Sequence, residues 1–430
     1  MKIAAIILFI VMYIIMIIFS KKRAVAALTT AAIFVLLTLL PIGDIPILSL
    51  TDLPRVINWN VIMMITGTMI IVDYFIESGM PSVIAEWLLR TAKNVMWVTI
   101  LLSLFSGIIS AFIDNVATVL MVAPIAIVIC KKLDISPVAT VICISVSSNL
   151  QGAATLVGDT TSIMLAGAAN MNFADFFVMN GKACMFFATE LGAILTVPIM
   201  MIMFRKDKAP VTSNEHTEVT DYFPSIMMVS YVLALIIASF IDGTPACING
   251  IICLSGAVIT MIAELIIHKD KKGLMHALKG MDIDMIFLLI GLFCVIGGIT
   301  NVGLIDDLAK MISAAGGGNK FLLFTIVVWG SVIISAFIDN IPYVATMLPI
   351  LGTVASNLGL EPYFLYFGLL VGATLGGNLT PIGASANIAG VGMLRKEGYE
   401  VSFPDFMKIG VPFTLTAVMS GYLFIWFIWT

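Results

Sequence analysis

The feature that most limits how this sequence can fold is a series of nearly continuous apolar runs, each about as long as a bilayer is thick. Residues 3–19, 24–40 and 183–204 are three of them. A run of about 20 apolar residues can cross the hydrocarbon core as a helix, in which backbone polar groups bond within their own segment. Hydrophobic residues make up 60% of the chain and charged residues only 11%. The sequence therefore predicts an all-α polytopic membrane protein.

One short polar phrase interrupts this apolar sequence twice. Residues 106–115 read Ser-Gly-Ile-Ile-Ser-Ala-Phe-Ile-Asp-Asn, and residues 331–340 read Ser-Val-Ile-Ile-Ser-Ala-Phe-Ile-Asp-Asn. The copies are 225 residues apart, and 12 of the 20 aligned positions from residue 106 to residue 125 are identical. Three further residues recur at the same offset: Gly152, Thr155 and Gly158 match Gly377, Thr380 and Gly383. The chain therefore contains an internal duplication.

The duplication predicts two halves of similar architecture, joined by a polar linker over residues 205–222. The first repeat, residues 1–204, has expected spans near 3–19, 24–40, 59–77 and 183–204, a hairpin over 95–130 and a broken helix over 136–167. The second repeat, residues 223–430, has expected spans near 223–241, 249–267, 284–302 and 408–429, a hairpin over 320–357 and a broken helix over 363–394. The hairpin arms meet at Asp114-Asn115 and at Asp339-Asn340.

The distribution of lysine and arginine predicts the orientation. If each hairpin is re-entrant, 17 of the 22 lysines and arginines lie on the cytoplasmic side together with the linker, in agreement with the positive-inside rule. Each half then crosses the membrane five times, so the second repeat is inverted and the two hairpin tips meet near the bilayer centre. Hairpin arms that cross fully also satisfy the charge rule, so this alternative stays open. The plasma membrane is the expected location.

The polar breaks inside the membrane form the candidate binding site. A helix that stops there leaves free N–H and C=O groups, and such backbone must line a cavity or be buried in protein. Carboxylates at this depth are costly and usually serve ion or proton pathways. The candidate residues are Asp114, Asn115, Thr118, Asn149, Thr155, Gly158, Asp159, Asp339, Asn340, Asn378, Thr380, Gly383, Ser385 and Asn387. Na+ would bind near Asp114, Asn149, Asp339 and Asn378. A simpler alternative is that Asp114 and Asp339 only cap the helices that follow them.

The remaining polar residues carry weaker signals. Glu190 is either a relay or a polar packing contact, and Asp73, Asp282 and Asp284 are expected to be solvated near span ends. The histidines have no metal-ligand spacing, and the six scattered cysteines are expected to pack as small apolar residues. We expect no cofactor beyond H+ or Na+ as the coupling ion, no nucleic-acid partner and no enzymatic activity. An integral-membrane enzyme such as an aspartyl protease is not favoured, because no Gly-x-Gly-Asp signature is present and the repeat already explains the two aspartates. The sequence has no P-loop, so pumping would draw on an ion gradient or a separate ATPase partner.

The paired motifs resemble those of the ion transporter superfamily. They comprise residues 112–116 with 156–159, and residues 337–341 with 380–387. The resemblance is strongest to the branch of ArsB arsenite permeases, NhaD sodium/proton antiporters and P proteins, and more distant to the citrate and divalent-anion/sodium symporters. It implies two inverted repeats, a substrate site between hairpin tips and broken helices, and often a homodimer with elevator-like movement.

Two differences from those symporters bear on the chemistry that the resemblance implies. Their hairpin tips read Ser-Asn-Thr, whereas the matching residues here are Asp114-Asn115-Val116 and Asp339-Asn340-Ile341. An acidic tip suits a proton or cation. Relatives often have Gly-Asp-Pro-Pro-Asn in the first break, whereas here Thr160, Thr161 and Ser162 follow Asp159.

The function that we expect from these features is secondary active transport of a small ion or inorganic solute, coupled to H+ or Na+. The alternative within the same fold is a Na+-coupled anion symporter of the citrate or dicarboxylate type. A passive channel is a further alternative, but no pore-lining series is recognisable.

Overall fold

The computed structural model describes residues 1–19, 22–39, 46–133, 135–210, 218–267 and 280–430. Within these residues the protein is almost entirely helical, with one short hairpin of strands β1 (Val178–Met179) and β2 (Lys182–Ala183). Seven described helices are long and apolar enough to cross a membrane, or eight if one bent helix pair counts as a span. The predicted all-α polytopic membrane fold is confirmed.

The helices of the first half follow the predicted order. They are α1 (Lys2–Ile18), α2 (Arg23–Leu39), α3 (Leu53–Val56), α4 (Trp59–Glu77), α5 (Met80–Leu89), α6 (Val95–Ser110), α7 (Asn115–Lys132), α8 (Val138–Gly152), α9 (Thr160–Ala169), the 3-10 turn η2 (Ala174–Phe176) and α10 (Met185–Met203). Both arms of the expected hairpin are present, and the expected broken helix consists of α8 and α9. The expected linker follows α10. Its residues 211–217 lie outside the described ranges.

The second half repeats this series. Its helices are α11 (Phe223–Ala238), α12 (Ile248–Ile267), α14 (Ile283–Asn301), α15 (Leu304–Gly316), α16 (Lys320–Ser335), α17 (Asn340–Leu358), α18 (Tyr363–Gly376), the 3-10 turn η3 (Gly377–Leu379), α19 (Ser385–Lys396) and α20 (Phe403–Trp429). Helix α15, which bends by 118° into α16, lies outside the spans expected from the sequence. The last span also begins earlier than expected, because Ser402 accepts a hydrogen bond from the Asp405 N–H and caps α20.

The duplication is visible in contacts as well as in sequence. The Thr155 hydroxyl donates to the carbonyl of Ala111, and the Thr380 hydroxyl donates to the carbonyl of Ala336, its counterpart 225 residues later. In both halves, therefore, the hairpin tip is fastened to the broken helix by the same threonine. This contact places the two breaks directly against the two tips.

The halves interlock rather than lie side by side. Helix α4 packs on α12 and α14 packs on α2, so each pair joins one helix from each half. A glycine allows the close approach in both pairs: a Cβ at Gly67 would lie 2.3 Å from the Cys253 carbonyl carbon, and one at Gly291 would lie 2.8 Å from that of Ala27. Van der Waals packing of this kind is a main source of helix association in lipid.

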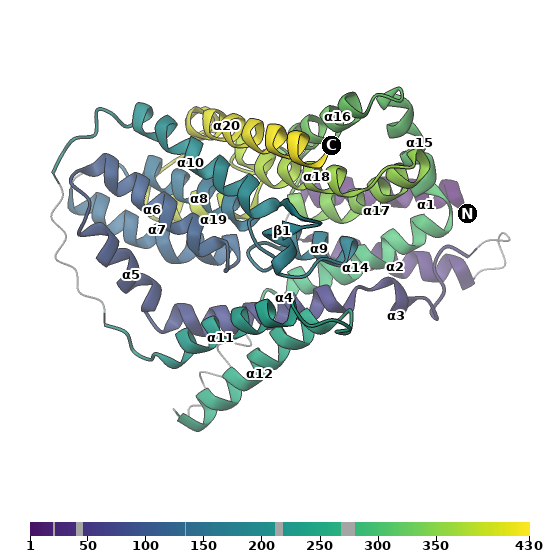
Figure 1. Cartoon of the computed structure of the whole chain (residues 1–430), viewed down its shortest axis with the longest axis horizontal. Helices are drawn as coiled ribbons and strands as arrows, with labels where there is room; N and C mark the ends of the chain where they lie inside the picture. The colour runs from purple at the N-terminus through teal and green to yellow at the C-terminus, as the bar shows by residue number, and fades with distance from the viewer. Residues whose placement is uncertain (20–21, 40–45, 134, 211–217, 268–279) are drawn as a thin grey trace.

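The second part of each broken helix crosses over to the other half. Helix α9 packs on α17 and α18, whereas α19 packs on α7 and α8. A Cβ at Gly390 of α19 would lie 2.3 Å from the Ser145 hydroxyl of α8, so the two helices are in close contact. In Figure 1, α19 accordingly lies with α6, α7 and α8 on the left, and α9 lies near the middle beside α14. Each hairpin is thus enclosed by residues of both halves.

Candidate functional site

The first hairpin tip lies between the end of α6 and the start of α7. The Asp114 carboxylate accepts hydrogen bonds from the backbone N–H groups of Val116 (3.0 Å) and Ala117 (3.2 Å). It therefore caps α7, as the simpler alternative predicts. The carboxylate is only partly enclosed, because Asp114 also lines a cavity of about 370 Å³. Capping uses one carboxylate oxygen and leaves the other available for a ligand.

The charged residues among the described lining of the cavity at the first tip are all acidic. Asp73 of α4 and Asp282, the N-cap residue of α14, line it together with Asp114. Asp73 and Asp282 were expected only at solvated span ends, but the folding of α4 and α14 around the tip places them at the same cavity as Asp114. Asp282 is exposed and also accepts a hydrogen bond from the Met285 N–H (2.9 Å).

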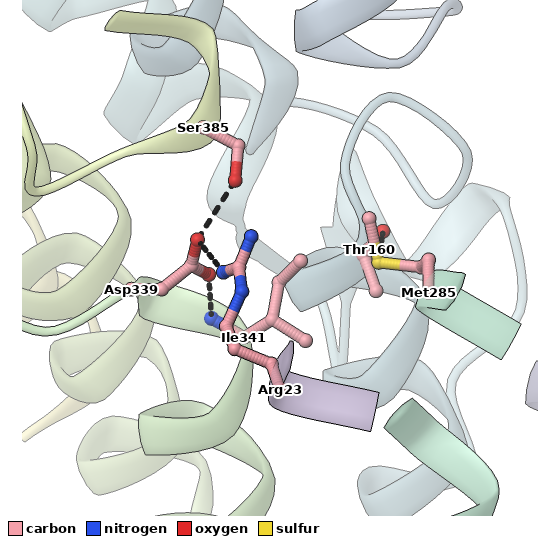
Figure 2. A network of polar contacts seen from close by, with 6 residues as sticks. All are labelled: Arg23, Thr160, Met285, Asp339, Ile341 and Ser385. Carbon is pink, nitrogen blue, oxygen red and sulfur yellow. Dashed lines mark hydrogen bonds and ion pairs between the residues drawn. The ribbon is translucent and has the colours of Figure 1, made fainter. Parts of the chain in front are cut away.

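The second tip has a different electrostatic environment. Asp339 caps α17 by accepting a hydrogen bond from the Ile341 N–H (3.1 Å). Its other oxygen accepts a hydrogen bond from the Ser385 hydroxyl (2.7 Å) and forms an ion pair with the guanidinium of Arg23. Figure 2 shows Arg23 and Ser385 approaching the carboxylate from different elements, α2 and α19. This carboxylate is therefore held by three helices from both halves.

A chain of amides connects the first tip to both broken helices. Asn115 donates to the side-chain oxygen of Asn149 (2.8 Å), and Asn149 donates to that of Asn378 (3.0 Å) and to the carbonyl of Thr374 (2.6 Å). Asn378 in turn donates to the carbonyl of Val146 (2.9 Å). All three asparagines are buried, with 0–5% of their surface exposed. The structure therefore brings together residues that are 34 to 263 positions apart in the sequence.

Asp159 lies at the start of α9, beside this amide chain. Its carboxylate accepts a hydrogen bond from the Thr161 hydroxyl (2.7 Å), which also contacts the hydroxyl of Thr374 in the other half (2.9 Å). Asp159 is 2% exposed. Its position at a helix N-terminus is one where the backbone dipole stabilises negative charge.

Several candidate residues have a structural role in the breaks themselves. Thr155 and Thr380 fasten the tips, and Asn387 donates to the carbonyls of Gly377 and Thr380 (both 3.1 Å). These bonds satisfy carbonyls that the end of α18 would otherwise leave without a partner. Gly158 and Gly383 allow the close approach of tip and break, because a Cβ at either position would lie within 2.8 Å of backbone carbonyl oxygens of both.

Other candidates offer polar atoms that the described residues do not satisfy. The hydroxyl of Thr118, the side-chain nitrogen of Asn340 and the side-chain oxygen of Asn387 are buried and have no hydrogen-bond partner in the described part of the chain. Buried polar groups are nearly always hydrogen-bonded, so each is a place where a solute, ion or water could bind. Among the described residues, no group of three or more His, Cys, Asp or Glu side chains could hold a metal ion.

The residues that sequence reasoning missed come from helices distant in the chain. Arg23 enters the sequence-based expectations only as one of the lysines and arginines that set the orientation, and Tyr13 enters none of them. The Tyr13 hydroxyl donates to the carbonyl of Pro342 (2.8 Å) and contacts the Thr346 hydroxyl (2.6 Å), so α1 also holds α17. A polar residue inside the first apolar run was the available signal for Tyr13. No local pattern distinguishes Arg23 from its basic neighbours.

Comparison with known proteins shows which family of transporters this sequence belongs to. The sequence profile of the citrate transporter family matches residues 11–372 and 251–430. The chain belongs to the citrate transporter family. It is also 31% identical over 375 residues to an uncharacterized transporter of Mycobacterium tuberculosis, covering 86% of each chain. The protein is therefore a multi-pass membrane transporter and not an enzyme.

Two further similarities agree with the resemblance seen in the motifs. The P protein of Homo sapiens is 24% identical over 465 residues, which cover 88% of this chain and 54% of that protein. The transporter thus spans about half the length of P protein. Its fold is similar to the crystal structure of the YdaH transporter of Alcanivorax borkumensis, described there as having an unusual topology, with a TM-score of 0.59, 15% identity and coverage of 94% and 95% of the two chains. Membership in this superfamily, as the motifs indicate, is confirmed.

Proposed function

We propose that this transporter is a secondary active transporter that moves a small ion or inorganic solute by coupling to H+ or Na+, as in the ArsB, NhaD and P-protein branch. The observation that carries the proposal is the acidic cavity at the first hairpin tip. The Asp114 carboxylate lies in this cavity with Asp73 and Asp282 and keeps one oxygen that capping does not use. A carboxylate in that position accepts a proton or coordinates a cation.

The solute site in this proposal lies between the tips and the broken helices. The amide chain of Asn115, Asn149 and Asn378 joins both halves there, and Asp159 and Thr161 lie beside it. These groups offer oxygen atoms to a cation and N–H groups to a polar solute. Each broken helix contacts the hairpin tip of its own half, and its second helix, α9 or α19, packs on the other half. Movement of one tip would therefore displace helices of both halves.

The proposed topology makes the second half an inverted copy of the first, with linker 205–222 on the cytoplasmic side of the plasma membrane. The charge distribution of the sequence supports this orientation. The equivalent tip contacts of Thr155 and Thr380 support the repeat relationship between the halves. A homodimer with elevator-like movement, and association with a separate ATPase, remain proposals that follow from the resemblance alone.

A Na+-coupled citrate or dicarboxylate symporter is the second candidate, and the family match favours it. A cavity of about 160 Å³ at the second tip is lined by both Arg23 and Asp339, and an anion that displaced Asp339 from the ion pair would meet the positive charge of Arg23. The acidic groups at the first tip would instead repel a carboxylate that arrives without its cation.

Transport in proteoliposomes tests both candidates. The purified protein would be reconstituted with imposed pH and Na+ gradients, and uptake of arsenite, Na+, citrate and succinate would be measured. We expect flux that depends on one of the two gradients and is lost in Asp114→Asn. The matched control is Asp307→Asn, which removes an exposed carboxylate paired with Lys2 at the surface. Flux that is independent of both gradients would reject coupled transport.

A further inference from the structure

A row of hydroxyl, thiol and amide side chains runs along the interface between α6 and α8, which pack closely on one another and lie side by side in Figure 1. Its members recur every three or four positions and so share one face of each helix. They are Thr99, Ser103, Ser106 and Ser110 of α6, and Thr140, Cys143, Ser147 and Gln151 of α8. All are buried, with 0–3% of their surface exposed. We call this row the α6–α8 seam.

Hydrogen bonds join the two helices at two levels of the seam. The hydroxyls of Thr99 and Thr140 are 2.8 Å apart, and the Ser106 hydroxyl donates to the carbonyl of Ile144 (3.1 Å). These contacts show that the hydroxyl groups face the interface between the helices. They do not face lipid.

Two polar groups of the seam are left without a partner near the hairpin tip. The Ser110 hydroxyl and the side-chain oxygen of Gln151 are buried and have no hydrogen-bond partner in the described part of the chain. The Gln151 nitrogen donates to the Ser147 hydroxyl (3.3 Å), and a Cβ at Gly107 would lie 1.8 Å from it, so this glycine makes room for the amide. Buried polar groups are nearly always hydrogen-bonded, and ordered water is a usual partner. Both groups therefore point to bound water.

The corresponding interface of the second half, between α16 and α18, packs as closely with mostly apolar residues. A Cβ at Gly368 would lie 2.5 Å from the Phe324 ring, and one at Gly376 would lie 2.6 Å from the Cα of Val332. Helix association of this kind needs small residues but no polar ones. Close packing alone therefore does not account for the polar seam. At the 225-residue offset its eight positions are occupied by Phe324, Val328, Ser331, Ser335, Leu365, Gly368, Gly372 and Gly376.

The seam ends beside Asp159. A Cβ at Gly152 would lie 3.4 Å from the Ser110 hydroxyl oxygen and 3.3 Å from the Cβ of Asp159, so both side chains border the same glycine. From Thr99 to Ser110 a helix rises by about 16 Å, roughly half the thickness of the hydrocarbon core. The seam therefore leads from the N-terminal part of α6, which the proposed topology places on the cytoplasmic side, to a buried carboxylate at the first break.

The surroundings of Asp159 include charges from other elements. Helix α9, which begins after Asp159, packs on α4, α17 and α18. Among the described residues, the charged groups that act on Asp159 are Asp114 and Asp339 at the two tips, and Asp339 pairs with Arg23. The Thr161 hydroxyl donates to the Asp159 carboxylate (2.7 Å).

We propose that the α6–α8 seam holds a file of water molecules that carries protons between the N-terminal part of α6 and Asp159. A proton enters as hydronium near Thr99, and exchange of O–H bonds along waters and hydroxyls passes the charge on. The Asp159 carboxylate takes up the proton and becomes a neutral carboxylic acid, and the reverse steps release it. Since the hydroxyls of Thr99 and Thr140 are in contact, a hydrated sodium ion does not fit between them. This inference rests on the proposed function and names H+ as its coupling ion.

Water in the seam can be tested without transport, by radiolytic hydroxyl-radical footprinting of the unmodified protein. The radicals form from water, so they oxidise side chains that lie against bound water. Two native cysteines are matched probes, because Cys143 lies in the seam, Cys253 lies in the α4–α12 interface, and both are 0% exposed. We expect Cys143 to be oxidised about fivefold faster than Cys253. Equally slow oxidation of both would show a dry seam and overturn the proposal.

The second test removes the seam hydroxyls in the variant Ser103→Ala/Ser106→Ala/Ser110→Ala. The matched control is Ser331→Ala/Ser335→Ala, at the positions that align with Ser106 and Ser110. Uptake of citrate and of arsenite driven by a pH gradient would be measured in proteoliposomes, with a pH dye in the lumen, together with equilibrium exchange of the same solutes without a gradient. We expect the seam variant to lose about tenfold in driven uptake and in proton movement while its exchange stays unchanged, because exchange needs no net proton transfer. The control should keep both.

The outcomes separate this inference from the function on which it rests. Unchanged driven uptake in the seam variant, or an equal loss of uptake and exchange, would overturn the proton path. Uptake driven by Na+ alone would also overturn it while leaving coupled transport intact. Flux of the unmodified protein that is independent of both gradients would instead refute the proposed function. If the seam variant does not fold, as judged by size-exclusion chromatography, Gln151→Leu in the same assays and the footprinting of the unmodified protein decide the question.

Discussion

The contact between hairpin tip and broken helix makes a sharp prediction for Gly158→Ala. The added methyl group would lie 2.5 Å from the carbonyl oxygen of Ser110, 2.6 Å from that of Gly152 and 2.7 Å from that of Ala111. Carbon atoms of side chains essentially never approach closer than 3.0 Å, so these oxygens must move away by 0.5, 0.4 and 0.3 Å respectively (3.0 minus each distance). All three belong to backbone, which cannot move aside as a flexible side chain can.

The expected loss of stability follows from that geometry. Overpacking of a closely packed interior typically lowers the free energy of unfolding by about 1–3 kcal/mol, and here the displaced oxygens belong to both the tip and the break. We therefore expect a lower apparent melting temperature, measured by tryptophan fluorescence in detergent. Gradient-driven flux should also fall, because the tip carrying Asp114 is pushed away from the site.

The matched control is Gly392→Ala in α19. No described heavy atom lies within 4 Å of the position that its methyl group would occupy. Replacing a helical glycine by alanine without a clash stabilises a protein by about 0.4–1 kcal/mol, so this variant should melt at or slightly above the temperature of the unmodified chain. If Gly158→Ala melts as high as Gly392→Ala, the close packing of tip against break is refuted.

Three further predictions test other parts of the structure. Gly383→Ala should match Gly158→Ala in its effect on melting, because its methyl group would lie 2.6–2.8 Å from three equivalent carbonyl oxygens; a silent substitution would contradict the repeat. Asn149→Ala should lower the free energy of unfolding by about 1–3 kcal/mol and abolish flux, because it removes the hydrogen-bond partner of both Asn115 and Asn378. Normal melting and flux in this variant would argue against the amide chain. Gly67→Leu should prevent monodisperse folding on size-exclusion chromatography, since α4 and α12 could no longer touch, whereas Gly330→Leu, which has no described atom within 4 Å, should fold normally.

The order of elements was largely predictable because it depends on local sequence. Apolar length predicts spans, and polar residues that interrupt them predict breaks, so the hairpin over 95–130 and the broken helix over 136–167 correspond closely to α6 to α9. The amphipathic helix α15 was missed because it is short and carries Asp306 and Asp307, which lower its apolar character. The cap role of Asp114 and Asp339 was also predictable, because capping involves only the next two or three residues.

Part of the grouping of the candidate site residues follows from the polar breaks in the sequence, and their role in binding stays a prediction. The asparagines, Asp159 and the threonines of the breaks were identified from their cost inside a membrane, and the structure brings Asn115, Asn149 and Asn378 into hydrogen-bond contact. Their common use in ion binding stays a prediction. The threonine pair of Thr161 and Thr374 could not be found from sequence, because it depends on α9 crossing into the other half.

The sequence by itself determined that this chain is a helical membrane protein with a duplicated pair of acidic tips and broken helices. Those properties follow from the length of apolar runs and from a 225-residue repeat, both of which can be read locally. Only the tertiary structure decided that the tips are unlike. Arg23 lies 316 positions from Asp339, and the packing of α2 on α14 helps to bring the two together, whereas the described donors to Asp114 are backbone N–H groups. Charge compensation depends on distance in space, so identical phrases acquire different chemistry from the helices that surround them.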